Sequence, residues 1–264
     1  GTDVDVYTIA VLITDDDSGS STQTVDLTVV NQAPSLTTLS FDEAVINEHS
    51  SATIRGTFTD AGVDDTHTVM IDWGGGSVGQ PAEGTTTLTT AGPNPSGTTL
   101  TSLGNGEWSF SATHQYEDDN PTGTATDSYS IDVVVTDDDT GSVGDDSTLI
   151  VRNVAPELEP LVLSSTVVPE DGNVTVSGTF TDVGLDSHTV VIDWGGGSGG
   201  IVHEGTTTLT TLGPNPTGTS LTDLGNGSWG FMATHEYLTA ASIASSYTLT
   251  VNVVDDDLGE DTAT

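Results

Sequence analysis

The sequence predicts an all-β protein in which β-sandwich domains follow one another in a linear array. Thr, Val, Ser, Gly and Asp are frequent, whereas Leu, Ala, Glu and Lys, which favour helices, are few. Long stretches of sequence return at a nearly constant spacing, which indicates tandem repeats. Apolar and polar residues alternate between turn-forming residues, and no segment has convincing helical periodicity.

Two copies of one motif set the spacing of the repeat. "THTVMIDWGGGS" at 66–77 returns as "SHTVVIDWGGGS" at 187–198, so Trp73 and Trp194 are 121 residues apart. The start of the chain fits the same period, because "VYTIAVLITDDDSGS" matches "SYSIDVVVTDDDTGS" one period later. We therefore expect the last strands of an upstream repeat at 1–30, a first repeat at 31–152, and a second repeat without its final strand at 153–264.

Residues 1–30 are too few to form a domain, because two strands do not bury a core by themselves. One interpretation is that the sequence is a window of a longer array. The other is that these strands complete a sandwich in a neighbouring subunit. We favour the first interpretation.

The first strands of repeat 1 are expected at 35–41 and 52–59, after the linker "NQAP". In "ATIRGTF" apolar and polar residues alternate, so the second strand should bury one face and expose the other. The β-branched stretch at 67–73 and the Thr-rich stretch at 85–90 are the next two strands.

Three further strands complete the unit, at 107–113, 128–136 and 147–153. Asn105-Gly106 is a strong hairpin signal directly before the first of them. "SYSIDVVV" alternates again, and the last strand leads into the linker "NVAP". Seven short strands in about 120 residues are typical of an immunoglobulin-like sandwich.

The charge of the chain limits its partners. Two Lys and Arg residues stand against 40 Asp and Glu residues, which gives a formal net charge of −38. Nucleic acids and anionic membranes are therefore excluded as partners, whereas cations are favoured. There is no cysteine for a disulfide or a Cys-based metal site, and no catalytic constellation stands out, so we expect no enzyme activity.

Three consecutive aspartates end the same strand in every unit. If the strand geometry persists, Asp137 and Asp139 share one side, which is a chelating arrangement. Calcium takes six to eight oxygen ligands, and Asp60 and Asp64 in "FTDAGVDD" could supply more of them. The alternative is a solvated acidic turn, since Asp is a common turn residue.

The second repeat guides the choice between neighbouring aspartates. It keeps Asp186 in "FTDVGLDS" but has Ser187 at the next position, so we expect Asp64 rather than Asp65 to bind the ion. The carboxylates expected to bind calcium are Asp15, Asp17, Asp60, Asp64, Asp137, Asp139, Asp182, Asp186, Asp255 and Asp257.

Together these motifs resemble the PKD-type domain of bacterial surface and secreted proteins, with its D-W/F-G-D-G, H-x-Y and Y-x-V-x-L-x-V-x-D patterns. The match covers both repeats and the tail. Gly75 and Gly196 replace the second acidic residue of the first pattern, so no role of that residue is transferred. The resemblance implies an extracellular spacer or adhesive module, and it adds Asn31 and Asn153 to the calcium ligands.

Other recurring residues have structural interpretations. His114 and Tyr116 are expected to be structural, and Trp73, Trp194, Trp108 and Trp229 to be core or half-buried residues. Glu48 and Glu170 recur before a strand. Each could reach the aspartate cluster of the previous unit, or could be an exposed edge charge.

The sequence therefore predicts an extracellular or cell-surface module in a saline or calcium-rich medium. Calcium would stiffen an array of neighbouring repeats into a stalk, fibre or adhesin shaft. One alternative is a filament or sheath subunit in which copies of the chain exchange strands. Another is an accessory module of a secreted enzyme that binds surface glycans, which an exposed aromatic strip would favour.

Overall fold

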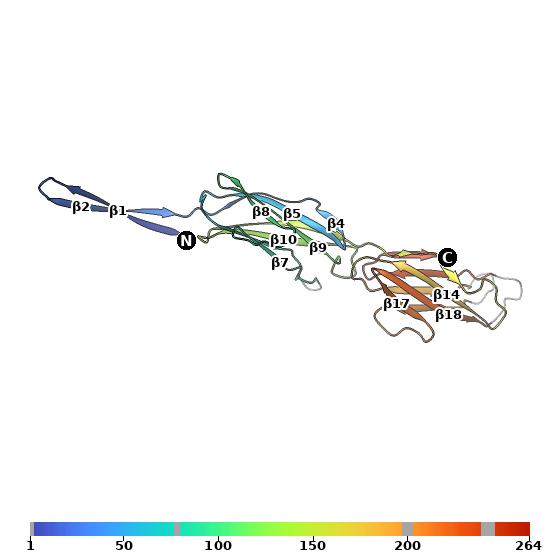
Figure 1. Cartoon of the computed structure of the whole chain (residues 1–264). Coiled ribbons are helices and arrows are strands. Elements are labelled where there is room, and N and C mark those ends of the chain that lie inside the picture. The colour runs from blue at the N-terminus through green and yellow to red at the C-terminus, as the bar shows by residue number, and fades with distance from the viewer. Residues whose placement is uncertain (1–2, 77–79, 197–202, 239–245) are drawn as a thin grey trace.

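The computed structural model describes residues 3–76, 80–196, 203–238 and 246–264 of the chain of 264 residues. A hairpin and two β-sandwiches follow one another along an elongated molecule (Figure 1). The described residues contain strands and no helix, which confirms the predicted all-β class. Among them, no helix exists that is long and apolar enough to cross a membrane.

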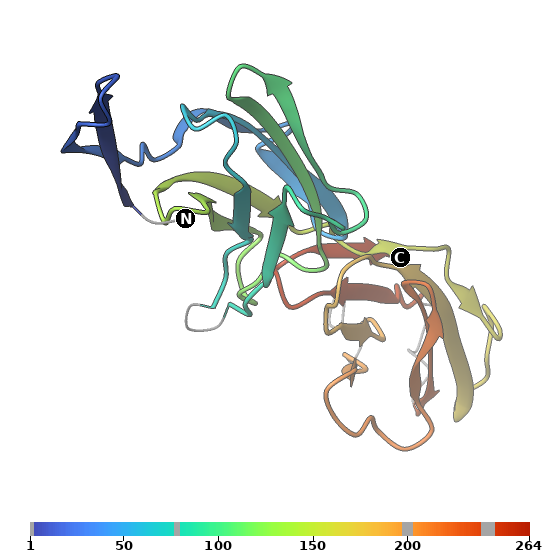
Figure 2. The same cartoon turned by 60° about the vertical axis from the view of Figure 1, so that its left-hand side comes forward.

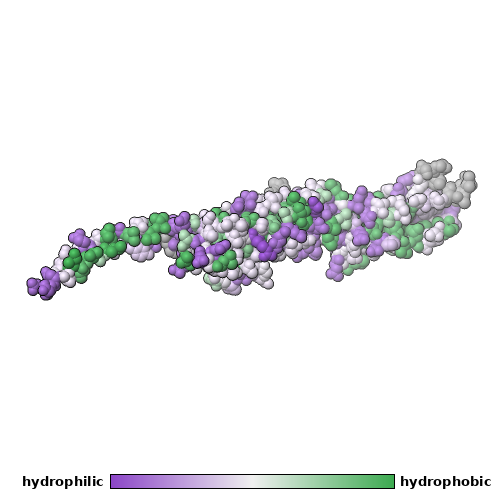
Figure 3. Space-filling view, turned by 90° about the horizontal axis from the view of Figure 1, so that it is seen from above, coloured by the Kyte–Doolittle hydropathy of each residue, from purple (hydrophilic) through white to green (hydrophobic). Residues whose placement is uncertain are grey.

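The first element is a hairpin of β1 (Val4–Thr14) and β2 (Ser20–Val30), which projects from the end of repeat 1 (Figure 1). All residues of both strands are exposed. Tyr7 and Ile9 match Tyr129 and Ile131, which are fully buried in repeat 1. The hairpin therefore carries core-type side chains on its surface, which are visible as apolar patches in Figure 3.

Repeat 1 is a sandwich of a four-stranded and a five-stranded sheet. The first sheet has the order β3 (Ser35–Phe41), β5 (Ser50–Thr59), β9 (Glu107–Tyr116), β8 (Thr99–Gly104). The second has the order β4 (Val45–Asn47), β11 (Ser142–Arg152), β10 (Thr126–Asp137), β6 (His67–Asp72), β7 (Thr85–Thr89). The seven predicted strands are present, and β4 and β8 are additional. This order, with β4 parallel to β11, is that of an immunoglobulin-like sandwich.

Repeat 2 repeats this arrangement. One sheet has the order β12 (Glu157–Leu158), β14 (Gly172–Thr181), β18 (Ser228–Tyr237), β17 (Ser220–Gly225), and β13 (Val162–Leu163) also pairs with β14. The other has the order β16 (Thr206–Thr210), β15 (Thr189–Asp193), β19 (Thr250–Val254), β20 (Glu260–Ala263). β20 pairs with β19 over four positions and corresponds to the first residues of β11, 142–145.

The core of each sandwich comes from the strand alternation that the sequence predicts. Along β10, Tyr129, Ile131, Val133 and Val135 are buried while the residues between them are less so. Burying such side chains stabilises the sandwich by about 1.5–3 kcal/mol each. Trp73 and its counterpart in repeat 2 are 1% exposed, which confirms the predicted core role, and the other two tryptophans are half-buried.

A polar cluster supports Trp73 at the end of β6. The Tyr116 hydroxyl donates to the Trp73 carbonyl oxygen over 2.9 Å, and the His114 ring stacks on Trp73 at 5.1 Å. His114 Nε2 lies 3.0 Å from a carboxylate oxygen of Glu83. Repeat 2 has the same arrangement, so the structural role expected for the His-x-Tyr motif is confirmed.

The strand directions decide which loops meet. The turn between β10 and β11 lies beside the preceding linker, because the Asn31 side chain donates to Asp137 there. The loops after β4 and β9 lie at the opposite end of repeat 1, where the side chain of Glu48 contacts the next linker. The two sandwiches meet end to end, as Figures 1 and 2 both show.

Candidate metal centre

Carboxylates from four loops meet where the two repeats join. Two loops follow β4 and β9 of repeat 1, and two follow β14 and β19 of repeat 2. The carboxylates form three overlapping groups of three, in each of which one oxygen per residue lies within 4.8 Å of the others. We call their six members the junction carboxylates; the groups are Glu48–Asp118–Asp119, Glu48–Asp182–Asp186 and Asp118–Asp186–Asp257.

The linker holds these loops together. The Asn153 side chain donates to Asp255 Oδ2 over 2.9 Å and to the Asp257 carbonyl oxygen over 3.3 Å. The next backbone N–H, that of Val154, donates to Glu48 Oε1 over 2.7 Å. Two successive linker residues therefore contact opposite repeats, which fixes the repeats against each other at this point.

The aspartate turn of repeat 2 is closed by its first aspartate. Asp255 Oδ1 accepts the backbone N–H groups of Asp257 at 3.0 Å and Gly259 at 2.7 Å. This turn aims Asp257 toward repeat 1, where its Oδ1 accepts the Gly123 N–H over 2.6 Å. Asp255 therefore shapes the site from outside the three groups.

A buried histidine contacts one of the same loops. His188 Nε2 lies 3.0 Å from Asp182 Oδ2, and both side chains are almost fully buried. Asp256 Oδ1 accepts the Ser187 N–H over 2.5 Å, which ties the loop after β14 to the aspartate turn. Among the described residues, His188 is the one basic side chain in an ion pair with a junction carboxylate.

Four of the six junction carboxylates are buried, and several of their oxygens lack hydrogen bonds. Glu48 is 1% exposed, and Asp119 and Asp257 are 0% exposed. A buried carboxylate oxygen that lacks a donor costs several kcal/mol as an ion, unless a cation compensates it. Six such oxygens lie at this junction: Oε2 of Glu48, both of Asp119, both of Asp186, and Oδ2 of Asp257.

The pKa values report this crowding. Burial raises the pKa of Glu48 to about 9, although the N–H of Val154 partly offsets the effect. Burial and then the nearby charge of Asp257 raise the pKa of Asp119 to about 8. Burial and then the charge of Asp182 raise the pKa of Asp186 to about 8. In the absence of a cation, the junction thus favours protonated carboxyl groups at neutral pH.

The donor set fits a hard divalent cation. The unpaired atoms of the junction carboxylates and of Asn153 are all oxygens, which are the ligands that calcium takes, while the unpaired Nδ1 of His188 belongs to none of the three groups. Zinc and copper sites commonly use Cys sulfur or His nitrogen ligands, and none of the three groups contains a Cys or His residue. The four loops supply enough oxygens for the six to eight ligands of calcium.

The N-terminal end of repeat 1 has one half of this arrangement. Asp60, Asp65 and Asp137 each place an oxygen within 4.8 Å of the others. Asp60 Oδ2 lies 2.9 Å from the buried His67, and Asn31 donates to Asp137 over 2.9 Å, as at the junction. Within the described residues, the segment before this end is the hairpin of β1 and β2.

The structure places Asp65, and not Asp64, in the group of carboxylates at the N-terminal end of repeat 1. Thr66 and Ser187 each donate their N–H to the middle aspartate of the turn in their own repeat, over 2.7 and 2.5 Å. Thr66 is therefore the counterpart of Ser187, and Asp65 that of Asp186. The loop of repeat 2 is one residue shorter. Matching the two loops from their N-terminal ends therefore pairs Asp186 with Asp64 instead of Asp65.

The strand geometry on which the expected chelation by the first and third aspartates depended does not persist, so that chelation stays a prediction. The strand geometry ends at the first aspartate, which accepts the N–H of the glycine four residues later in all three turns. The expected ligands that belong to none of the groups are Asp15, Asp17, Asp64, Asp139 and Asp255, while Asn31 and Asn153 hold the turn by donating to its first aspartate.

Three junction residues escaped sequence reasoning. Glu48 was interpreted as a residue that could reach the previous unit or be an exposed edge charge. It is buried and reaches the following unit, because the loop after β4 lies at the C-terminal end of its sandwich. Asp118 and Asp119 gave no repeated signal, since "EDDN" follows Tyr116 whereas "LTAA" follows the equivalent tyrosine. Their adjacency to Asn120-Pro121 was the one local cue.

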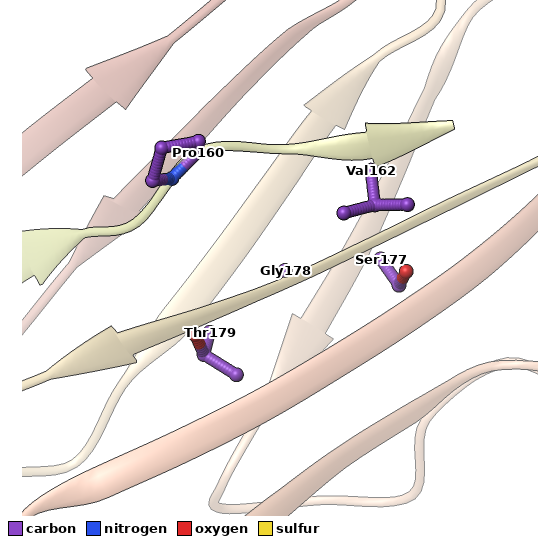
Figure 4. Close-up of a pocket in the computed structure, with 5 residues that line it drawn as sticks. All are labelled: Pro160, Val162, Ser177, Gly178 and Thr179. Atoms are coloured by element: carbon purple, nitrogen blue, oxygen red, sulfur yellow. The ribbon is translucent and has the colours of Figure 1, made fainter.

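Outside the junction, repeat 2 has a shallow depression of about 230 Å³ beside β13 (Figure 4). It is lined by Pro160, Val162, Ser177, Gly178 and Thr179. It contains no titratable group, so it offers no chemistry beyond weak apolar contact.

No protein-family profile and no curated protein matches the chain. Among solved structures it is similar to a crystal structure of a tetra-tandem repeat in the extending region of a large adhesion protein, with 17% identity and a TM-score of 0.43. The alignment covers 98% of this chain and 55% of that one, so the chain spans about half the length of that structure. Similarity at this level carries no functional weight, and the fold rests on the strand pairing above.

Proposed function

We propose that the protein is a spacer segment of an extracellular adhesion protein, in which calcium at the junction locks successive sandwiches into a stiff shaft. The observation that carries this proposal is the set of six carboxylates, four buried and two half-buried, contributed by both repeats, with six buried oxygens that lack a donor. Neither repeat assembles this set alone.

Calcium would act as an electrostatic switch for stiffness. Without it, contact of the two sandwiches requires either repulsion between ionised carboxylates of the facing loops or the uptake of protons by them. With it, Glu48 from repeat 1 and Asp186 from repeat 2 share one ion, and repulsion becomes a bridge. The short linker limits the orientations that remain, because Asn153 and Val154 are already held.

The proposed setting follows from ordinary affinities of such sites. Extracellular modules bind calcium at about 10⁻⁴–10⁻³ M. A saline, calcium-rich medium would therefore fill the junction, and its salt would screen the remaining surface charge of a chain with a net charge of −38.

One alternative function has a specific observation in its favour. The apolar side chains exposed on β1 and β2 would be buried if a neighbouring chain completed the sandwich, as in a filament or sheath. The glycan-binding alternative needs an exposed aromatic strip. Tyr7 on the hairpin is the one largely exposed aromatic side chain in the described residues.

Small-angle X-ray scattering and thermal unfolding test the proposal, in 5 mM calcium and in EDTA. We expect calcium to narrow the distribution of molecular lengths and to raise the melting temperature by roughly 5–10 °C near saturation. Magnesium is the control, because it demands octahedral geometry and dehydrates reluctantly, so its effect should be smaller. Identical scattering curves and melting temperatures in calcium and EDTA would refute the proposal.

A further inference from the structure

The junction carboxylates do not approach one another as one compact set. Ligands of one calcium ion, each about 2.3–2.6 Å from it, lie up to about 5 Å from one another. Among the described residues, the junction carboxylates form groups of three within 4.8 Å, in which Asp119 shares no group with Asp182, and Glu48 shares none with Asp257. The carboxylates therefore divide into two sides.

Unpaired buried oxygens occur on both sides of this set. On one side, Glu48 Oε2 and both oxygens of Asp186 lack a donor. On the other, both oxygens of Asp119 and Oδ2 of Asp257 lack one. Asp118 belongs to two groups and lies between the sides. One divalent ion would leave four of the six formal negative charges uncompensated, apart from the contact of Asp182 with His188.

The two sides differ in how they recur in the sequence. Glu48 has a counterpart in Glu170, and Asp182 and Asp186 have counterparts in Asp60 and Asp65. We call Glu48, Asp182 and Asp186 the recurring site, because each of its residues has a counterpart in the other repeat.

The other side depends on one loop of repeat 1. Tyr116 and Tyr237 are equivalent, since each donates its hydroxyl to the carbonyl oxygen of the buried tryptophan in its own repeat. After Tyr116 come Glu, Asp and Asp, but after Tyr237 come Leu, Thr and Ala. We call Asp118, Asp119 and Asp257 the loop site, because two of its residues occur in repeat 1 alone.

We propose that the junction binds two calcium-type cations, one at the recurring site and one at the loop site, and that junctions in such an array differ in strength. This inference rests on the proposed function. A junction made by the C-terminal end of repeat 2 would have Glu170 but no counterpart of Asp118 or Asp119, so it would hold the first ion alone. The acidic loop of repeat 1 thus marks a stiffer position in an array of otherwise similar repeats.

The test counts bound calcium by isothermal titration calorimetry and native mass spectrometry on the whole chain. The double variant D118T/D119A installs the residues of repeat 2, and we expect it to bind one calcium ion fewer than the wild type. The control D145T/D146A removes two exposed aspartates from β11 and should bind the wild-type number. Counting differences avoids any assumption about the half-site at the N-terminal end of repeat 1.

The outcomes separate the two proposals. No calcium binding by the wild type would end the proposed function itself. Wild-type binding with an unchanged count in D118T/D119A would overturn the two-ion inference alone, and so would the loss of both junction ions together. Circular dichroism checks that the variants fold. If D118T/D119A is misfolded, D119N, which keeps the side-chain shape, replaces it, and it too should bind one calcium ion fewer than the wild type.

Discussion

The two ends of repeat 1 carry similar clusters of carboxylates, but the cluster at the N-terminal end has fewer members than the one at the C-terminal end. At the N-terminal end, Asp60, Asp65 and Asp137 approach one another beside a hairpin that contributes no counterpart of Glu48. At the C-terminal end, the equivalent loops of repeat 2 meet three carboxylates of repeat 1. The difference shows that one repeat assembles a group of three carboxylates by itself, and that contact with a neighbouring repeat enlarges the set to six.

A substitution of Glu48 should have the largest effect on the difference between the two ends. Replacing it by Gln keeps the hydrogen bond acceptor for Val154 but removes the charge shared by two groups. We expect calcium affinity at the junction to fall about tenfold or more, since ligand charge sets the affinity of such sites. Calorimetric titration measures the change. The matched control is Glu170→Gln, at the equivalent and exposed position of repeat 2, which should change affinity less than twofold.

The pH dependence of the calcium-free protein is a second way to separate the ends. Native pKa values of about 8–9 at Glu48, Asp119 and Asp186 lie above those of the unfolded chain, near 4. The native state therefore binds more protons in this window, and its stability is greatest below pH 4–5 and is lost as the pH rises through 8–9.

We expect the melting temperature in EDTA to fall by several degrees between pH 5 and pH 9. Saturating calcium should abolish or reverse the trend, because the ion binds the deprotonated carboxylates. Differential scanning calorimetry at fixed ionic strength measures both series. Parallel curves with and without calcium would contradict the assignment of the cation to these groups.

A smaller effect on cation binding is expected from substitutions at the N-terminal end of repeat 1, and it distinguishes Asp65 from Asp64. Asp65→Asn should weaken cation binding at the N-terminal end of repeat 1 by roughly threefold, because one of three charged ligands is lost. Asp64→Asn, its neighbour, should leave binding within error. Terbium luminescence titration of both variants makes the comparison, and an equal loss in the two would restore Asp64 as a ligand.

The smallest expected effect concerns acidic residues that lie far from any cation. In the second sheet of repeat 1, Asp132 lies directly opposite Asp72 on one strand and Asp146 on the other. Like charges opposite each other destabilise a sheet, so Asp132→Thr should stabilise repeat 1 by about 0.5 kcal/mol. Repeat 2 already has Thr250 at the equivalent position. Urea unfolding in EDTA measures the gain, and calcium should not change it.

The fold was largely predictable because its signals are local. Alternation along "SYSIDVVV" gives one buried face of β10, and Asn105-Gly106 gives the turn between β8 and β9. The repeat then carries these elements into the second sandwich. β4 escaped prediction because three residues are too short for a periodic signal, and its parallel pairing with β11 is a long-range contact.

The site was predictable only in part, because it lies between domains. Asp182, Asp186 and Asp257 were found by recurrence, which reports what each repeat contributes by itself. Asp118 and Asp119 occur once, so recurrence hid them. The choice between Asp64 and Asp65 depended on where a one-residue deletion falls, and only the hydrogen bond of the next residue to the aspartate turn decides it.

The placement of Glu48 and the aspartate turn at opposite ends of one sandwich gives the array a polarity. The end of a sandwich that carries Glu48 fits the end of the next sandwich that carries the aspartate turn. Two ends with aspartate turns, facing each other, would bring only those turns together. Contacts of this heterologous kind do not close into a dimer, and they extend a line in one direction. The two repeats of this chain accordingly meet head to tail, with the loops after β4 and β9 of one against the aspartate turn of the next.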